Sequence, residues 1–215
     1  MEVLRLSEIG ANAGWNRIFS NVNLSVESGG RVGILGENGV GKSTLLEIIG
    51  GLRVAECGEI AVFGRTMASL GDFKAIRRNI GFLFQNSDDG FICPSALEDV
   101  AFSLLTQGVD KEMAKAESAA ILEKFGIPHL AHKSVFNLSG GEKRLVSLAG
   151  VLISKPKLLL LDEPTAALSP SARDKILSIL DANSATQIII SHDKGELEVL
   201  GAKVHCLKSG GLAEW

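Results

Sequence analysis

A glycine-rich segment has the composition of a loop that binds phosphate. It reads Gly36-Glu37-Asn38-Gly39-Val40-Gly41-Lys42-Ser43, the pattern G-x-x-x-x-G-K-[ST]. The glycines allow successive backbone N–H groups to curl around an anion, and the N-terminus of a following helix adds its positive dipole end. Lys42 would reach the β- and γ-phosphates, Ser43 would ligate Mg²⁺, and Thr44 would add a hydroxyl at the α-phosphate. The segment therefore predicts a site for a nucleotide and magnesium.

Two adjacent carboxylates, Asp162 and Glu163, follow the apolar run 158–161. Ionised carboxylates at a buried strand end are costly without a cation or hydrogen bonds, and Mg²⁺ would supply the cation. Because side chains alternate along a strand, the two acids can take different roles. We expect Asp162 to support the Mg²⁺ shell and Glu163 to orient or deprotonate the attacking water. The alternative is a solvated acidic turn, which the phosphate loop in the same chain argues against.

Short apolar runs alternate with helical segments and would position these residues. Runs at 32–35, 80–84, 158–161 and 188–190 predict strands that are apolar on both faces. Such strands suit the centre of a parallel sheet that helices cover on both sides. The segment 42–49 predicts a helix directly after the phosphate loop.

Between Gln85 and about Gly150 the pattern becomes mainly helical. Asp110 is expected to cap an amphipathic helix. The apolar residues assigned to that helix are Met113, Ala116, Ala120 and Ile121. A second helix is expected to begin after Gly141. The residues expected on its buried face are Leu145, Leu148, Ala149 and Leu152. This part of the chain predicts a helical insertion in an α/β core.

Length and composition favour a single folded domain over other classes of protein. The chain has 215 residues, of which 46% are hydrophobic, and this fraction excludes a mostly disordered chain. The formal net charge of -3 argues against nucleic acid as the main partner. Cys57, Cys93 and Cys206 have no metal-ligand spacing and are expected to be free thiols in a reducing cytosol. We expect neither a signal peptide nor a membrane span, because no apolar run approaches about 20 residues.

The segment Leu138-Ser139-Gly140-Gly141-Glu142 resembles the signature motif of ATP-binding cassette (ABC) ATPases and precedes the acidic strand as in that family. Taken alone, it could be only a turn and a helix start. It also offers a hydroxyl and a helix N-terminus suited to an anion. The resemblance implies that Ser139, Gly140 and Gly141 contact, in trans, the ATP on the phosphate loop of a second ATPase subunit.

Two further positions match motifs of the same family. Gln85 resembles the Q-loop glutamine, which implies contact with Mg²⁺ and sensing of a transmembrane partner. His192 resembles the switch histidine, and a neutral imidazole there could hydrogen-bond the γ-phosphate and the water. The five motifs follow one another in the family's order from Gly36 to His192.

The resemblance implies an α/β fold of the P-loop NTPase class, with a mostly parallel central sheet, an N-terminal antiparallel β part and a helical insertion. Residues 1–215 would form one ABC ATPase domain. Within it, 1–85 and 156–215 would form the nucleotide-binding core, and 86–155 would form the helical subdomain with the signature motif.

Residues 85–102 and 139–151 are similar to the ATPases of energy-coupling factor importers, which take up vitamins and cobalt or nickel ions. Ser87 and Gly90 depart from that group's usual proline and glutamine. The likeness implies an ATP-hydrolysing subunit at the cytoplasmic face of the cell membrane, bound to an integral membrane subunit. A soluble cassette ATPase in DNA repair, chromosome organisation or translation, and an exporter subunit, remain the alternatives.

Two features depart from the family pattern. Ser169 stands where an aspartate is usual, which bears on communication between subunits and on the hydrolysis rate. The adenine-stacking aromatic residue expected near the N-terminus has Trp15 as its candidate. A hairpin core residue is the alternative role for Trp15.

Overall fold

A six-stranded sheet forms the centre of the computed structural model, which describes residues 1–215. In order across the sheet, its strands are β10 (Gly211–Glu214), β9 (Lys203–Lys208), β3 (Arg31–Leu35), β8 (Thr186–Ile190), β7 (Leu158–Asp162) and β6 (Ile80–Leu83). Neighbours from β9 to β6 run parallel, and β10 runs antiparallel to β9. The expected mostly parallel central sheet is confirmed.

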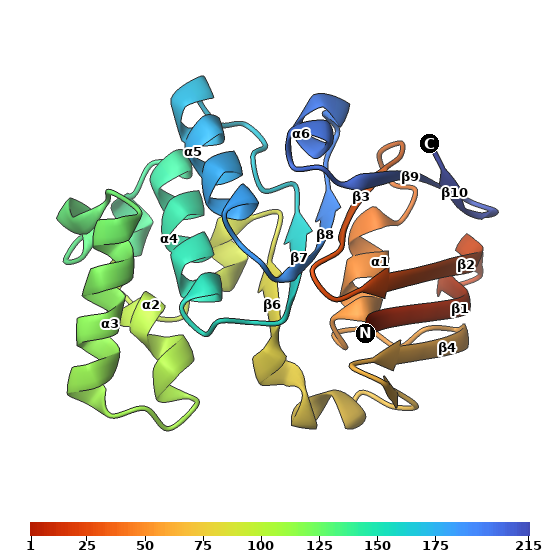
Figure 1. Cartoon of the computed structure of the whole chain (residues 1–215), viewed down its shortest axis with the longest axis horizontal. Helices are drawn as coiled ribbons and strands as arrows, with labels where there is room; N and C mark the ends of the chain where they lie inside the picture. Colours follow the sequence, from red (N-terminus) through yellow and green to blue (C-terminus); the bar gives the residue numbers. More distant parts are fainter.

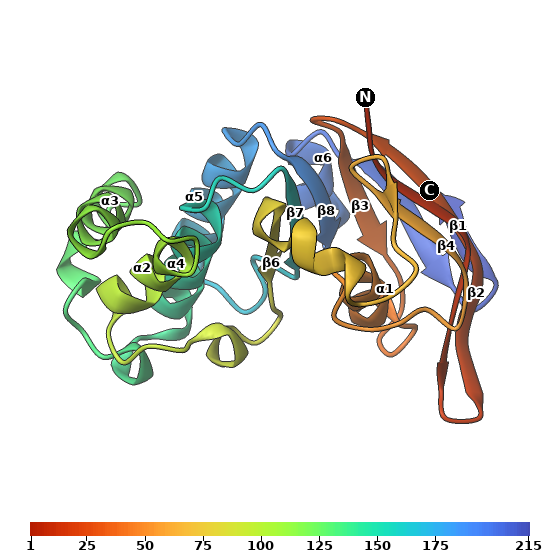
Figure 2. The same cartoon turned by 90° about the horizontal axis from the view of Figure 1, so that it is seen from below.

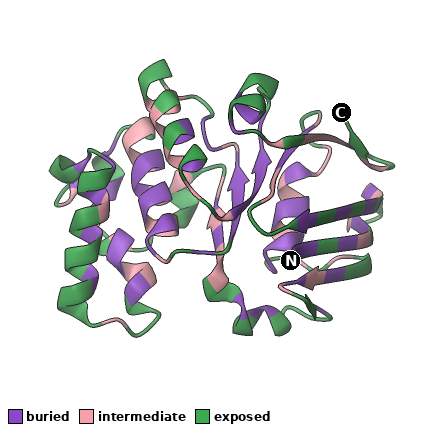
Figure 3. Ribbon diagram, viewed as in Figure 1, coloured by how far each residue is buried: buried purple, intermediate pink, exposed green.

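The central strands are apolar on both faces because a hydrophobic cluster packs against each face of this sheet. Along β7, Leu158 and Leu160 belong to one cluster, whereas Leu159 and Leu161 belong to the other. This alternation follows from the two-residue period of a strand. β7 and β8 are buried along their whole length, as Figure 3 shows.

A second, four-stranded sheet covers one face of the fold. In order across the sheet, its strands are β2 (Asn16–Glu27), β1 (Glu2–Ala13), β4 (Cys57–Val62) and β5 (Arg65–Thr66). All its pairings are antiparallel, as expected for the N-terminal part. Helix α1 (Lys42–Ile49) shares one hydrophobic cluster with both sheets, which gives the loop before α1 a rigid support (Figure 1).

Helices cover the opposite face and extend past the β6 edge. They are α2 (Ala96–Leu105), α3 (Lys111–Lys124), α4 (Gly140–Leu152), α5 (Pro170–Asp181) and α6 (Lys194–Val199). Figures 1 and 2 show α2, α3 and α4 at the end of the molecule away from the antiparallel sheet. None of the helices combines the length and the apolar character that a bilayer span requires.

The structure corrects two expectations about the helices. Helix α3 begins after Asp110 as predicted, but its buried residues are Ala114, Ser118 and Leu122, while Met113 is exposed. Helix α4 begins at Gly140, two residues earlier than expected, because Ser139 and Glu142 form a capping box at its start. The buried face expected for α4 is confirmed: Leu145, Leu148, Ala149 and Leu152 are all buried.

Candidate nucleotide site

The glycine-rich loop connects the end of β3 to the first turn of α1. Gly41 caps this helix with a φ of 102°, and a Cβ at this position would lie 2.4 Å from Cγ2 of Ile18. Only glycine fits both the backbone conformation and the space. Lys42 is buried, and its Nζ donates hydrogen bonds to the carbonyl oxygens of Gly36 at 2.8 Å and Glu37 at 2.9 Å. The lysine ammonium is therefore held inside the curve of the loop.

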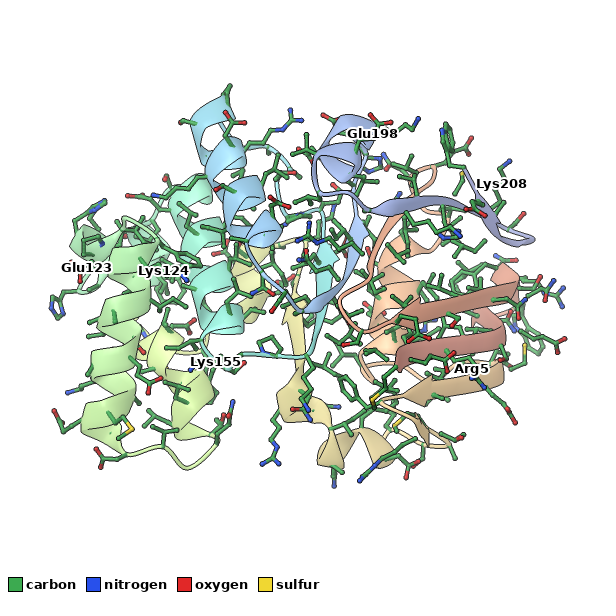
Figure 4. The ribbon with its side chains drawn as sticks, in the orientation of Figure 1. Arg5, Glu123, Lys124, Lys155, Glu198 and Lys208 are labelled. Carbon is green, nitrogen blue, oxygen red and sulfur yellow. The ribbon has the colours of Figure 1, made fainter.

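A cavity of about 840 Å³ opens beside this loop, a volume that suits a small-molecule ligand. Residues 36–40 form one wall, and His192 and Lys208 lie on the others. Figure 4 labels Lys208, at the end of β9. Trp215 also lines the cavity. No sequence pattern indicated this position, because the position of Trp215 depends on the antiparallel pairing of β10 with β9.

Asp162, the last residue of β7, lies against the start of α1. Its carboxylate is buried and accepts a hydrogen bond from the side chain of Ser43. Burial raises the pKa of Asp162, and the Ser43 hydrogen bond opposes that rise. The structure thus brings together two of the residues expected to support Mg²⁺.

Glu163 and His192 follow neighbouring strands and meet beyond their ends. Asp162 pairs with Ile190 in the β7–β8 ladder, so the residues after each strand emerge side by side. Oε1 of Glu163 lies 2.6 Å from Nε2 of His192. The backbone of Glu163 has a φ of 47°, in the left-handed region, which turns the chain sharply after β7. In Figure 1 the arrowheads of β7 and β8 point toward the end of the sheet at which this pair lies.

A buried carboxylate supports the loop that carries His192. Oε2 of Glu196 accepts hydrogen bonds from Thr165 at 2.6 Å and Ser191 at 2.9 Å. Arg173 reaches both Oε1 of Glu196 at 2.8 Å and Oδ2 of Asp193 at 2.7 Å. This network joins the chain after β7 to the chain after β8. Glu196 is not among the residues predicted from the sequence, where its position four residues after His192 is its only signal.

The remaining candidate residues lie outside the cavity beside the loop. Gln85 is exposed and follows β6, whose Leu83 pairs with Leu161 of β7. Ser139 is exposed at the start of α4, and its Oγ and backbone N both interact with Glu142 at 2.8 Å. Residues 139–141 are absent from the cavity lining.

Trp15 lies at the turn between β1 and β2, on the hairpin that projects from the molecule in Figure 2. It is fully exposed, so its alternative role as a hairpin core residue is wrong. A turn residue at the end of a hairpin has no second layer to pack against. Adenine stacking by Trp15 stays a prediction, and Trp15 does not line the cavity beside the loop.

Comparison with known proteins assigns the chain to a family. The profile of the ABC transporter family matches residues 19–166. A putative ABC transporter ATP-binding protein of Brucella suis is 42% identical over 210 residues, 98% of this chain and 87% of that protein. A nickel import ATP-binding protein of Rhodobacter capsulatus is 40% identical over 91% of this chain and 81% of that protein. An energy-coupling factor transporter ATP-binding protein of Methanothermobacter thermautotrophicus is 37% identical over 89% of this chain and 63% of that protein.

A solved structure extends the likeness to the fold. A dimeric ATP-binding cassette in a post-hydrolysis state, bound to ADP and phosphate, superimposes with a TM-score of 0.87. It is 27% identical to this chain, and the match covers 98% of each chain. The phosphate loop, the acidic strand end and the signature segment of this chain occur in that family's order. The chain therefore belongs to the ABC transporter family and is an ABC ATPase.

Proposed function

We propose that this ABC ATPase is the ATP-hydrolysing subunit of an energy-coupling factor importer for a metal ion or a vitamin. The relatives from Rhodobacter capsulatus and Methanothermobacter thermautotrophicus, named for nickel import and for an energy-coupling factor transporter, support this choice. The likeness of residues 85–102 to that group supports it independently. The subunit would work at the cytoplasmic face of the membrane, bound to an integral membrane subunit.

The residues of the phosphate loop would bind ATP. Lys42 already holds its ammonium within the loop, bound to two carbonyl oxygens, and would exchange these for the β- and γ-phosphate oxygens. Thr44 would contact the α-phosphate, and the backbone of residues 36–41 would surround the β-phosphate. Trp15 would contribute to adenine binding, which requires the β1–β2 hairpin to approach the nucleotide.

The donor set around Asp162 fits Mg²⁺. Mg²⁺ prefers hard oxygen ligands, and Ser43, Asp162 and Gln85 supply a hydroxyl, a carboxylate and an amide oxygen. Burial raises the pKa of the Asp162 carboxyl, which a neighbouring cation would offset. Held by these residues, Mg²⁺ would supply positive charge to offset the negative charge that develops during phosphoryl transfer.

The single observation that carries the hydrolysis proposal is the contact between Glu163 and His192 beside the phosphate loop. Their 2.6 Å separation holds the carboxylate of Glu163 in one orientation at the end of β7. A carboxylate held there can accept a proton from water that attacks the γ-phosphate. His192, which lines the cavity, would hydrogen-bond the γ-phosphate or that water.

The complete site would need a second ATPase subunit. Ser139, Gly140 and Gly141 present a hydroxyl and a helix N-terminus, yet they do not line the cavity of their own chain. Across a dimer they would contact the γ-phosphate on the partner subunit. The dimeric form of the related cassette bound to ADP and phosphate supports this arrangement.

The first prediction tests the role of Glu163. Glu163→Gln keeps the size of the side chain and removes its capacity to accept a proton. We expect ATP to bind normally while turnover falls roughly 10²-fold or more, the order of a general-base contribution. Calorimetry with Mg-ATP and steady-state phosphate release measure the two quantities. Glu198→Gln, on the exposed side of α6, is the control (Figure 4). Near-normal turnover of Glu163→Gln would remove Glu163 from the mechanism.

A further inference from the structure

Arg144, on the second turn of α4, is a buried cation whose hydrogen-bond partners are all backbone carbonyls. Only 3% of its surface is exposed. Its Nε donates to the carbonyl oxygen of Pro164 at 2.9 Å, and Nη2 donates to that of Asp162 at 2.8 Å. Nη2 also donates to the carbonyl of Glu163, and Nη1 donates to the carbonyl of Phe84. Four backbone carbonyls therefore converge on one guanidinium.

A buried cation without a hydrogen-bonded carboxylate is expensive, because it loses its hydration. Burial lowers the pKa of Arg144 to about 10, while the negative charges of Asp162 and Glu163 oppose that fall. Arg144 is therefore still charged at neutral pH. The next two residues of α4, Leu145 and Val146, are apolar and buried, so apolar side chains also pack in this part of the helix. Helix packing alone does not require a cation here.

The carbonyls bound by Arg144 belong to two segments of the candidate site. Residues 162–164 comprise the end of β7 and the start of the turn after it, where Glu163 takes a left-handed backbone conformation. A turn fixed by three hydrogen bonds sets the direction of the Glu163 side chain, which must meet His192. Phe84 directly precedes Gln85, so the same guanidinium also holds the start of the segment that carries this glutamine.

Arg144 lies on the helix whose N-cap is Ser139. A rigid α-helix transmits a displacement of its N-terminus to a residue one turn further along. The guanidinium would pass such a displacement to the turn that carries Glu163. One side chain therefore connects the segment proposed to contact the partner's ATP with the segment proposed to hydrolyse ATP on its own chain.

We propose that Arg144 is a positioning residue for ATP hydrolysis. It holds Glu163 and the segment before Gln85 in the arrangement needed for the chemical step, and it makes that arrangement depend on the position of α4. This inference rests on the proposed function. It assigns no contact between Arg144 and the nucleotide, so its loss affects turnover and leaves ATP binding in place.

The test compares substitutions of Arg144 with a matched substitution elsewhere. Arg31 provides the comparison: its Nη1 donates to the carbonyl oxygen of Leu200 at 2.7 Å and its Nη2 to that of Asp181 at 2.6 Å, and Nη1 also pairs with the Asp181 carboxylate at 2.7 Å. It lies at the start of β3, at the other end of that strand from the phosphate loop. The variants are Arg144→Met, Arg144→Lys and Arg31→Met, each purified in the assembly in which the wild-type chain hydrolyses ATP.

We expect Arg144→Met to lower kcat at least about tenfold and to leave the KM for ATP within about threefold, because small displacements of catalytic groups cost large factors in rate. Arg144→Lys keeps the charge with fewer donors and should recover part of kcat. Arg31→Met should lower the denaturant midpoint but keep kcat per folded molecule within about twofold. If Arg144→Met does not fold, Arg144→Lys alone decides: a kcat equal to that of wild type overturns the inference.

A mixed dimer identifies the chain on which Arg144 acts. One chain carries Lys42→Ala, so that ATP remains on the other chain, and Arg144→Met is added to either chain in turn. We expect the larger loss of kcat when Arg144→Met lies on the chain that holds ATP, because that chain supplies Glu163. A loss confined to the opposite placement would show that Arg144 serves only the signature segment, and the inference would be wrong. An inactive wild-type assembly would instead count against the proposed function.

Discussion

The carboxylate of Asp162 lies between the end of β7 and the side chain of Ser43, where water has little access. Burial raises its pKa, so the native protein holds the proton of Asp162 more tightly than the unfolded chain does. The ionised carboxylate therefore reduces stability at any pH above the native pKa. The same buried carboxylate that suits a cation therefore lowers the stability of the protein when no cation is bound.

The second prediction concerns the charge of Asp162 and the stability of the protein. In the absence of Mg²⁺, Asp162→Asn should have a higher free energy of unfolding than wild type at neutral pH. The difference should shrink as pH falls through the raised pKa toward the usual pKa of an aspartate, because both proteins are then neutral at this position. Urea denaturation at a series of pH values measures it, with Asp174→Asn on α5 as an exposed control. A difference that does not change with pH would contradict the prediction.

The third prediction concerns Lys42 and ATP affinity. Lys42→Ala removes the cation inside the phosphate loop, and charge-assisted hydrogen bonds contribute on the order of 1.5–3 kcal/mol. We expect the affinity for Mg-ATP to fall at least about tenfold, measured by calorimetry. Lys208→Ala is the control, since Lys208 lines the cavity beside the phosphate loop but is exposed on β9. An equal effect of the two substitutions would show that net charge, not the loop position, determines affinity.

At the scale of single elements, α3 shows how a helix end contributes to stability. Oδ1 of Asp110 accepts hydrogen bonds from the backbone N–H groups of Glu112 at 2.9 Å and Met113 at 3.3 Å. These groups have no partner within the helix, so the side chain satisfies them. Helix α3 lies at the end of the molecule away from β3 and α1, the elements that the phosphate loop connects, as Figure 1 shows. Its cap can therefore be removed without disturbing the nucleotide.

The fourth prediction follows from this cap. Asp110→Ala should lower the free energy of unfolding by about 1 kcal/mol, the usual effect of losing an N-cap. Asp110→Asn should retain most of the stability, because its amide oxygen can accept the same hydrogen bonds. Chemical denaturation gives the energies, and ATP turnover of both variants should match wild type. An Asp110→Ala protein as stable as wild type would show that the cap contributes nothing in the folded chain.

The strands β3, β6, β7 and β8 could be predicted from the sequence because each coincides with a short apolar run. The buried face of α3 could not. Ser118 is polar in the sequence, yet it is fully buried and donates its hydroxyl hydrogen to the carbonyl oxygen of Ala114 at 2.7 Å. Met113 is apolar, yet it is exposed at the first turn. A helix with such a weak apolar pattern receives its orientation from its neighbours α2 and α4.

The start of α4 could have been predicted correctly from a capping box in the sequence. Ser139 and Glu142 have the three-residue spacing of a capping box, which places the first helical residue at Gly140. Residues of the phosphate loop and the acidic strand end could be found because each follows a strand of the same parallel sheet. Arg144 contacts Pro164, and Glu196 contacts Thr165, across long stretches of sequence, so only the packing of the folded chain shows these contacts.

At the scale of the whole molecule, the phosphate loop and the signature segment lie on different elements with β7 and β8 between them. The cavity beside the loop contains no residue of 139–141. We infer that one copy of the chain does not bring its own Ser139 to the nucleotide that is proposed to bind beside the loop. A second copy, related by a twofold axis, can bring its Ser139 to that site, and the first copy then completes the site of the second.

The fifth prediction tests this arrangement by complementation. Ser139→Arg places a long cation where a small hydroxyl is proposed to approach the partner's γ-phosphate, and Lys42→Ala disables ATP binding on its own chain. Neither variant alone should hydrolyse ATP. A mixture should regain part of the activity, because a mixed dimer contains one site with an intact phosphate loop from the first chain and an intact signature segment from the second. Phosphate release at a series of mixing ratios measures this recovery.

The substitution of Ser139 also removes the capping box of α4, so a loss of stability must be separated from a loss of the site. Asp110→Ala, which removes a helix cap on α3, serves as the control: in a mixture with Lys42→Ala it should add its own full activity without any complementation. ATP bound across the interface stabilises the dimer by mass action, so wild-type turnover per molecule should also rise with protein concentration. If the Ser139→Arg protein alone hydrolyses ATP at the wild-type rate at every concentration, the signature segment does not act in trans.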